Sequence, residues 1–121
     1  MNAARRLAIA ALLAALAGPV AGAGEDRVTR GAQLFGRHCE QCHGPLAEGN
    51  GPLAARYDPR PSNLRASTRS DDYKLQIISL GGAAMGRSPV MPEWGLELTG
   101  QEILALVEYL RSIAPAQEKG A

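Results

Sequence analysis

The sequence is poor in aromatic residues, with one phenylalanine, one tryptophan and three tyrosines among 121 residues. Alanine and glycine are abundant instead, and such small side chains bury little apolar surface each. A short domain built from them gains only a modest core from its own chain. We therefore expect a bulky apolar group other than the chain to complete the interior.

Cysteine and histidine are also scarce, with two of each. Two cysteines cannot supply the several disulfides that usually hold a small exported domain together. The sequence also lacks a block of like charge, because its 13 basic and 12 acidic residues are mixed along the chain. Nothing in this distribution indicates a nucleic-acid partner. No strand pattern, internal repeat or acid–base pair suited to catalysis stands out.

One long apolar run is present, at residues 7–17, directly after two arginines and before a helix-breaking Gly-Pro pair. The run is too short to span a bilayer core of about 30 Å. Ala21 and Ala23 supply the small residues that a signal peptidase requires. We expect residues 1–23 to be a cleavable signal peptide that sends a domain of residues 24–121 to the periplasm. The alternative is an uncleaved membrane anchor.

Three segments have the apolar spacing of helices. They run from Asp26 to about Cys39, from the cap residue Ser70 to Gly81, and from the cap residue Thr99 to Pro115. The last is the clearest, because Thr99 and Glu102 have the spacing of a capping box. The stretches between them, residues 44–69 and 81–95, are rich in glycine and proline and resist regular structure. The expected class is all-α with long loops.

Both cysteines and both histidines lie in one short stretch, "HCEQCH", at residues 38–43. Within it, Cys39, Cys42 and His43 form the C-x-x-C-H motif of c-type haem attachment. On a helical turn, residues three apart point the same way, so both thiols can bond to one porphyrin edge. His43 then lies beneath the iron as the proximal axial ligand.

The same motif has three other possible roles, and the sequence favours none of them over haem attachment. A thioredoxin-like redox pair would need a βαβ context, which the sequence lacks. A zinc site would need ligands from a second segment, whereas these are all local. A disulfide between Cys39 and Cys42 would close a very small loop and stabilise the domain little. The export signal favours haem, because bacteria attach it outside the cytoplasm.

The second axial position of such an iron has few candidates. His38 directly precedes Cys39 and cannot reach the opposite haem face, so we expect it at the surface or in a packing contact. Met85 and Met91 remain. Met91 is favoured, since the prolines of "SPVMP" stiffen its loop, while Met85 lies in a flexible run that suits gap-filling better.

Together these features resemble the bacterial class I monohaem cytochromes c, and the likeness extends from the first helix to the last. The resemblance implies a small cytochrome c fold, with three main helices and long loops wrapped around one haem c held by Cys39 and Cys42. It also implies that Gly31 and Phe35 of the first helix pack against Tyr109 of the last.

The resemblance further assigns roles around the haem. Met91 matches the family's distal ligand, and Pro52 matches the proline whose carbonyl accepts a hydrogen bond from the proximal histidine. Pro52 could equally be only a helix-starting proline. Trp94 follows the methionine loop, where its indole could donate to a haem propionate or pack on the ring edge.

The expected function is electron transfer through His/Met-ligated haem. The protein would be a soluble periplasmic carrier or a small cytochrome subunit of a periplasmic oxidoreductase, and not itself an enzyme. It would be a monomer or one subunit of a heteromer, exchange electrons with redox partner proteins, and meet a membrane only transiently, through a redox complex. The alternative is a haem enzyme or gas sensor whose sixth coordination position is open or labile.

Overall fold

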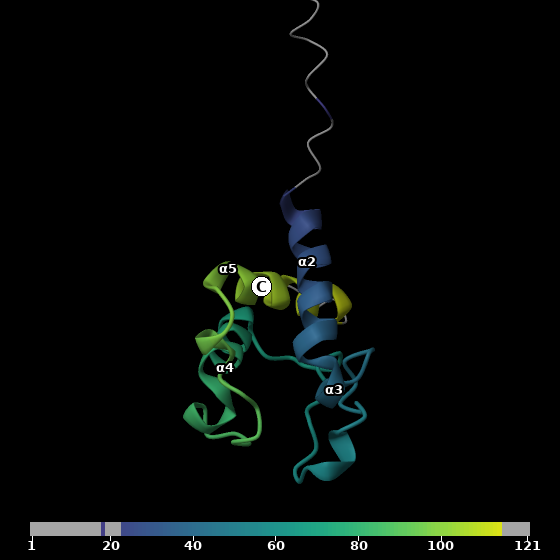
Figure 1. Ribbon diagram of the computed structural model, residues 1–121, viewed down its shortest axis with the longest axis vertical. Helices are drawn as coiled ribbons and strands as arrows, with labels where there is room; N and C mark the ends of the chain where they lie inside the picture. Colours follow the sequence, from purple (N-terminus) through teal and green to yellow (C-terminus); the bar gives the residue numbers. More distant parts are fainter. Residues whose placement is uncertain (1–17, 19–22, 115–121) are drawn as a thin grey trace, which may run out of the picture.

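The computed structural model describes residue 18 and residues 23–114. In this part of the chain the regular elements are helical and no strand is present, which confirms the all-α class (Figure 1). The expected signal peptide lies outside the described residues, apart from residues 18 and 23. No helix within the described part is long and apolar enough to cross a membrane. The elements are α2 (Ala23–His38), α3 (Glu40–His43), η2 (Ala54–Arg56), α4 (Asp71–Ala84), η3 (Trp94–Leu96) and α5 (Gly100–Ile113).

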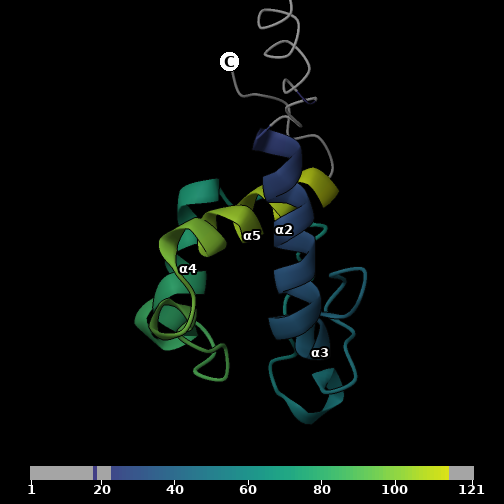
Figure 2. The same cartoon turned by 45° about the horizontal axis from the view of Figure 1, so that its top comes forward.

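Helices α2 and α5, the first and last in the described part of the chain, cross each other and form the main packing interface (Figures 1 and 2). Gly31 permits the crossing, because a Cβ atom there would clash with the carbonyl oxygen of Ala105. The rings of Phe35 and Tyr109 meet beside it with their centroids 5.4 Å apart. This contact confirms the packing expected of these three residues.

The buried core is concentrated around this crossing. Most of its side chains come from α2 and α5, with one from α4 and two from the loops. Large apolar side chains elsewhere are exposed or only partly buried; Leu46 and Leu80, for example, are exposed. The buried set is Leu34, Phe35, Ala47, Ile78, Leu98, Ile103, Ala105, Leu106, Val107 and Leu110.

Side chains cap the two C-terminal helices as the sequence predicts. The Ser70 hydroxyl accepts a hydrogen bond from the amide of Tyr73, and Thr99 forms a capping box with Glu102. The predicted end of α4 at Gly81 is instead a kink. Gly81 has φ 78°, and a further helical turn follows it to Ala84.

Two segments extend away from the α2–α5 crossing (Figure 1). We call residues 39–69 the cysteine arm, which contains α3 and η2, and residues 71–97 the methionine arm, which contains α4 and η3. Within the described chain, α3 and η2 do not pack against α4 or η3.

Candidate functional site

The cysteine arm begins with the two thiols on one turn. Cys39 is the N-cap residue of α3, and Cys42 and His43 lie within that helix. Both cysteines are free and half-buried, so no disulfide joins them. Burial raises the pKa of the Cys39 thiol to about 12, with a further contribution from the nearby Cys42. The Cys39 thiol is thus protonated at neutral pH.

The ring of His43 is fixed by a backbone oxygen. Its Nδ1 atom lies 2.9 Å from the carbonyl oxygen of Ser62, and because a carbonyl can only accept, Nδ1 carries the proton. Burial lowers the pKa of His43 below its usual 6.5, although the bond to Ser62 opposes that change. The imidazole is therefore neutral near pH 7, and its Nε2 lone pair is free to bind a metal.

This contact corrects the role expected of Pro52. The carbonyl that fixes His43 belongs to Ser62, and the loop after the motif explains why. Gly51 and Leu53 donate their amides to the carbonyls of Cys42 and Gln41, at 3.1 and 2.9 Å, which ties the intervening Pro52 alongside the backbone of α3. Pro52 is exposed there and precedes the η2 turn, in keeping with its alternative interpretation as a helix-starting residue.

Ser62 reaches His43 because the cysteine arm folds back on itself. The amide of Leu64 donates to the carbonyl of Ala47 at 2.7 Å. This hydrogen bond brings the end of the loop, near Ser62, beside its start. Gly49 permits this approach, since a Cβ atom there would lie 3.1 Å from the carbonyl carbon of Ser62. No side-chain signal marks Ser62 in the sequence, because every residue has a carbonyl.

Met91 lies in the methionine arm, where backbone hydrogen bonds hold it. Its carbonyl accepts from the amide of Gly82 at 3.0 Å, and its own amide donates to the carbonyl of Ser88 at 3.3 Å. Its partly buried side chain packs against the core. Met85 differs, being the C-cap residue of α4 and outside that core cluster.

Trp94, the first residue of η3, packs against His38. The indole and imidazole ring centroids are 5.0 Å apart, with the rings tilted by 60°. This contact confirms the packing expected of His38, whereas the sequence does not predict it for Trp94. The expected contact of Trp94 with a haem propionate or ring edge stays a prediction.

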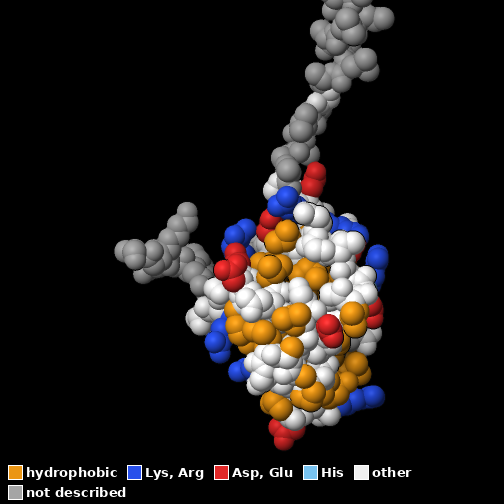
Figure 3. Space-filling view, turned by 90° about the vertical axis from the view of Figure 1, so that its left-hand side faces the viewer, with side chains coloured by type: hydrophobic (Ala, Val, Ile, Leu, Met, Phe, Trp, Pro, Cys, Tyr) orange, Lys and Arg blue, Asp and Glu red, His pale blue; other side chains and the backbone are white. Residues whose placement is uncertain are grey.

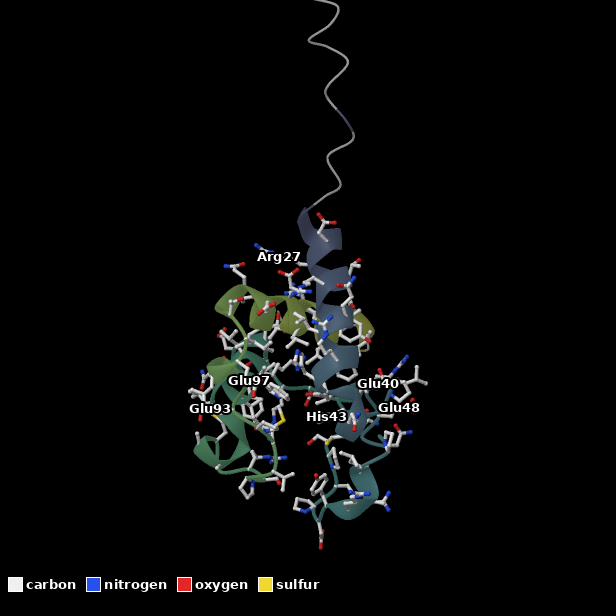
Figure 4. All side chains as sticks on the ribbon, viewed as in Figure 1. Arg27, Glu40, His43, Glu48, Glu93 and Glu97 are labelled. Carbon is white, nitrogen blue, oxygen red and sulfur yellow. The ribbon has the colours of Figure 1, made fainter. Side chains whose placement is uncertain are left out.

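The structure thus places Cys39, Cys42 and His43 on one turn, with Met91 on the other arm. Figure 4 shows His43 at the lower end of the α2 and α3 segment, across from the arm that bears Glu93 and Glu97. In the described residues, no three His, Cys, Asp or Glu side chains gather to hold a metal ion by themselves.

The donor chemistry fits a covalently held haem. Two free thiols are available for thioether bonds, and an oriented neutral imidazole and a thioether are typical axial ligands of haem iron. The porphyrin would supply the remaining iron ligands, so a cluster of protein donors is not required.

Comparison with known families agrees with this donor set. The family model described as cytochrome c matches residues 28–114, which include the α2–α5 crossing and both arms. A search of curated proteins found no match.

Proposed function

This chain belongs to the cytochrome c family, and on that premise we propose that it carries electrons with His43 and Met91 as the two axial ligands of one haem c. Haem-based electron transfer is the function that the family implies. Cys39 and Cys42 would hold the haem through thioether bonds. The observation that carries the proposal is the hydrogen bond from His43 Nδ1 to Ser62, which leaves Nε2 for the iron.

The bound haem would supply an iron that cycles between the ferrous and ferric states. The residues around it keep the ligands in a fixed arrangement in both oxidation states. Ser62 fixes the orientation and tautomer of His43. A Met91 thioether on the iron would favour the ferrous state, and partly buried apolar residues such as Leu64 and Ile77 would help to exclude water, so both effects would raise the reduction potential.

The absorption spectrum of the mature holoprotein tests the ligand assignment. We expect Met91→Ala to abolish the far-red ferric band that methionine ligation produces, and to let carbon monoxide bind rapidly to the ferrous protein. Met85→Ala is the matched control, from the same loop, and should leave both properties unchanged. Rapid, tight carbon monoxide binding by the unaltered protein would instead favour the open-site enzyme or sensor.

A docking face for redox partners is part of the proposal. Small apolar residues of the methionine arm, Ala83, Ala84 and Val90, are exposed, with Val90 46 % accessible. The neighbouring Leu80 is 48 % accessible. The view onto this side of the molecule shows hydrophobic side chains gathered over it, with few charges among them (Figure 3). Such a surface suits brief redox encounters, which bury little area.

Electron self-exchange between ferrous and ferric copies tests this face without an identified partner. Aspartate at Ala83 and Val90 should slow self-exchange, measured by NMR line broadening, because docking would then bring like charges together. Aspartate at Leu46, an exposed apolar residue of the cysteine arm, is the control. Equal rates in all three proteins would refute the docking face.

The cellular setting is proposed from the sequence. The N-terminal pattern supports export to the periplasm, where the mature protein would serve as a free carrier or as a subunit of a larger oxidoreductase. The intact mass of the isolated protein tests the cleavage, which should remove residues 1–23 and add one haem. Co-purification of a stoichiometric second chain would favour the subunit role over the free carrier.

A further inference from the structure

The two proposed iron ligands lie on arms whose helices do not pack against each other. In the described chain, the backbones of α3 and η2 in the cysteine arm do not come close to those of α4 or η3 in the methionine arm. An iron bound from both sides nevertheless requires a fixed separation between His43 and Met91. Some contact near the ligands must therefore help to set that separation.

The ring contact of His38 with Trp94 lies where such a contact is needed. His38 is the last residue of α2 and directly precedes Cys39, at the start of the cysteine arm. Trp94 belongs to the methionine arm, three positions after Met91. Both rings are partly buried, and their centroids are 5.0 Å apart. A direct side-chain contact thus joins the methionine arm to the end of α2, immediately before the cysteine arm.

The backbone around Trp94 is well anchored, so the position of its ring is coupled to that of Met91. The carbonyl of Trp94 accepts hydrogen bonds from the amides of Glu97 and Leu98, at 3.0 and 2.8 Å, and Leu98 is buried in the core. Between Met91 and Trp94 only Pro92 and Glu93 intervene, and the proline ring restricts the backbone.

The backbone of residues 91–93 also lies close against α4. A Cβ atom at Gly81 would lie 3.1 Å from both the carbonyl oxygen of Met91 and the amide nitrogen of Glu93. The segment from Met91 to Trp94 therefore has little room to move independently of α4. A displacement of Trp94 would be transmitted to Met91.

We propose that His38 and Trp94 are a positioning pair that sets the reach of Met91 to the haem iron. This inference rests on the proposed His43 and Met91 ligation and extends it to two residues that do not touch the iron themselves. Trp94 supplies a wide apolar ring, and the His38 ring packs against it from the end of α2, next to Cys39. Loss of either ring lets the methionine arm relax away from the haem.

Imidazole binding to the ferric holoprotein measures this effect, because added imidazole competes with the Met91 thioether for the iron. An aromatic pair contributes enough for His38→Ala or Trp94→Ala to raise the imidazole affinity about 2- to 10-fold. The far-red methionine band should weaken in parallel. His38→Phe and Trp94→Phe keep an aromatic contact and should remain close to the unaltered protein.

A double-mutant cycle separates this pair from unrelated destabilisation. His38→Ala combined with Trp94→Ala should raise the affinity no more than either change alone, since one contact is lost in all three. Arg37→Ala, at the exposed neighbour of His38, is the control and should have no effect.

Two outcomes would overturn the inference and are distinguishable. Unchanged imidazole affinity in the alanine variants, or additive effects in the double variant, would refute the positioning pair while leaving His/Met ligation intact. Absence of the methionine band from the unaltered holoprotein would refute the ligation itself, and the positioning pair with it.

Discussion

At the scale of single residues, Gly31 determines how closely α2 approaches α5. A Cβ atom at this position would clash with the carbonyl oxygen of Ala105 and lie 2.7 Å from Cβ of Tyr109. Neither atom can move aside freely, because one belongs to the backbone of α5 and the other is the first atom of its side chain. Any larger residue must therefore push the two helices apart.

We expect Gly31→Ala to lower the free energy of unfolding of the holoprotein by about 2–3 kcal/mol, as an overpacked core does. Gly36→Ala in the same helix is the matched control, because a Cβ atom there has only the carboxylate of Glu40 near it, at 3.4 Å. The control should be neutral or gain up to about 1 kcal/mol from helix propensity. Urea denaturation measures both, and equal losses would contradict the close-crossing argument.

At the scale of elements, the start of α5 carries a charged cap. The Thr99 hydroxyl accepts from the amide of Glu102 at 3.3 Å, and the Glu102 carboxylate accepts from the amide of Thr99 at 3.0 Å. Arg30 of α2 adds an ion pair to the same carboxylate at 2.7 Å. The backbone hydrogen bond from Thr99, followed by that from Arg30, holds the pKa of Glu102 below its usual 4.5.

This lowered pKa makes the stability of the protein depend on pH in a defined direction. The contribution of ionised Glu102 is fully present above its unfolded-state value of 4.5 and is lost as the pH falls through the folded-state value. We expect Glu102→Gln to be less stable than the unaltered protein at pH 7, with the difference shrinking below pH 4.5. Urea denaturation at a series of pH values measures this difference.

Thr99→Ala serves as the companion variant for this prediction. It removes the hydroxyl that accepts from Glu102 but keeps the backbone amide that donates to the carboxylate. Its loss should be about 1 kcal/mol, typical of an N-cap threonine, with most of the pH dependence retained. If the stability of Glu102→Gln depended on pH as that of the unaltered protein does, the charged cap would not be the source of this dependence.

At the scale of the whole molecule, the core is confined to one end. The buried side chains cluster around the α2–α5 crossing, while the cysteine arm adds only Ala47 to the core cluster and the methionine arm only Ile78. Helices that lack a packed face are marginal in water. A haem attached at the cysteine arm would supply the apolar surface against which both arms can pack.

We therefore expect Cys39→Ala combined with Cys42→Ala to yield a largely unfolded, colourless chain when expressed with the haem-attachment machinery. The measurement is far-UV circular dichroism, which should lose most of the helical signal of the holoprotein. The unaltered chain expressed without that machinery should behave the same way. Native-like helicity in either preparation would contradict the view that the cofactor completes the core.

The sequence by itself determined the main helices and contains the C-x-x-C-H motif on which the proposed haem attachment rests. The cap residues Ser70 and Thr99, the close approach at Gly31 and the all-α class are confirmed by the structure. The caps and the all-α class could be predicted because they depend on local spacing and side-chain type, whereas the close approach at Gly31 was implied by the resemblance to cytochromes c. The placement of Cys39, Cys42 and His43 on one helical turn could be predicted for the same reason, because it depends only on their spacing.

Only the tertiary structure decided which groups from distant parts of the chain meet. The His43 ring binds the carbonyl of Ser62 rather than that of Pro52, and Trp94 packs on His38. A backbone carbonyl is present in every residue, so the sequence cannot mark the one that a folded loop brings to a ring. Likewise, a contact between segments more than fifty residues apart depends on how two arms leave a helix crossing, which no local pattern encodes.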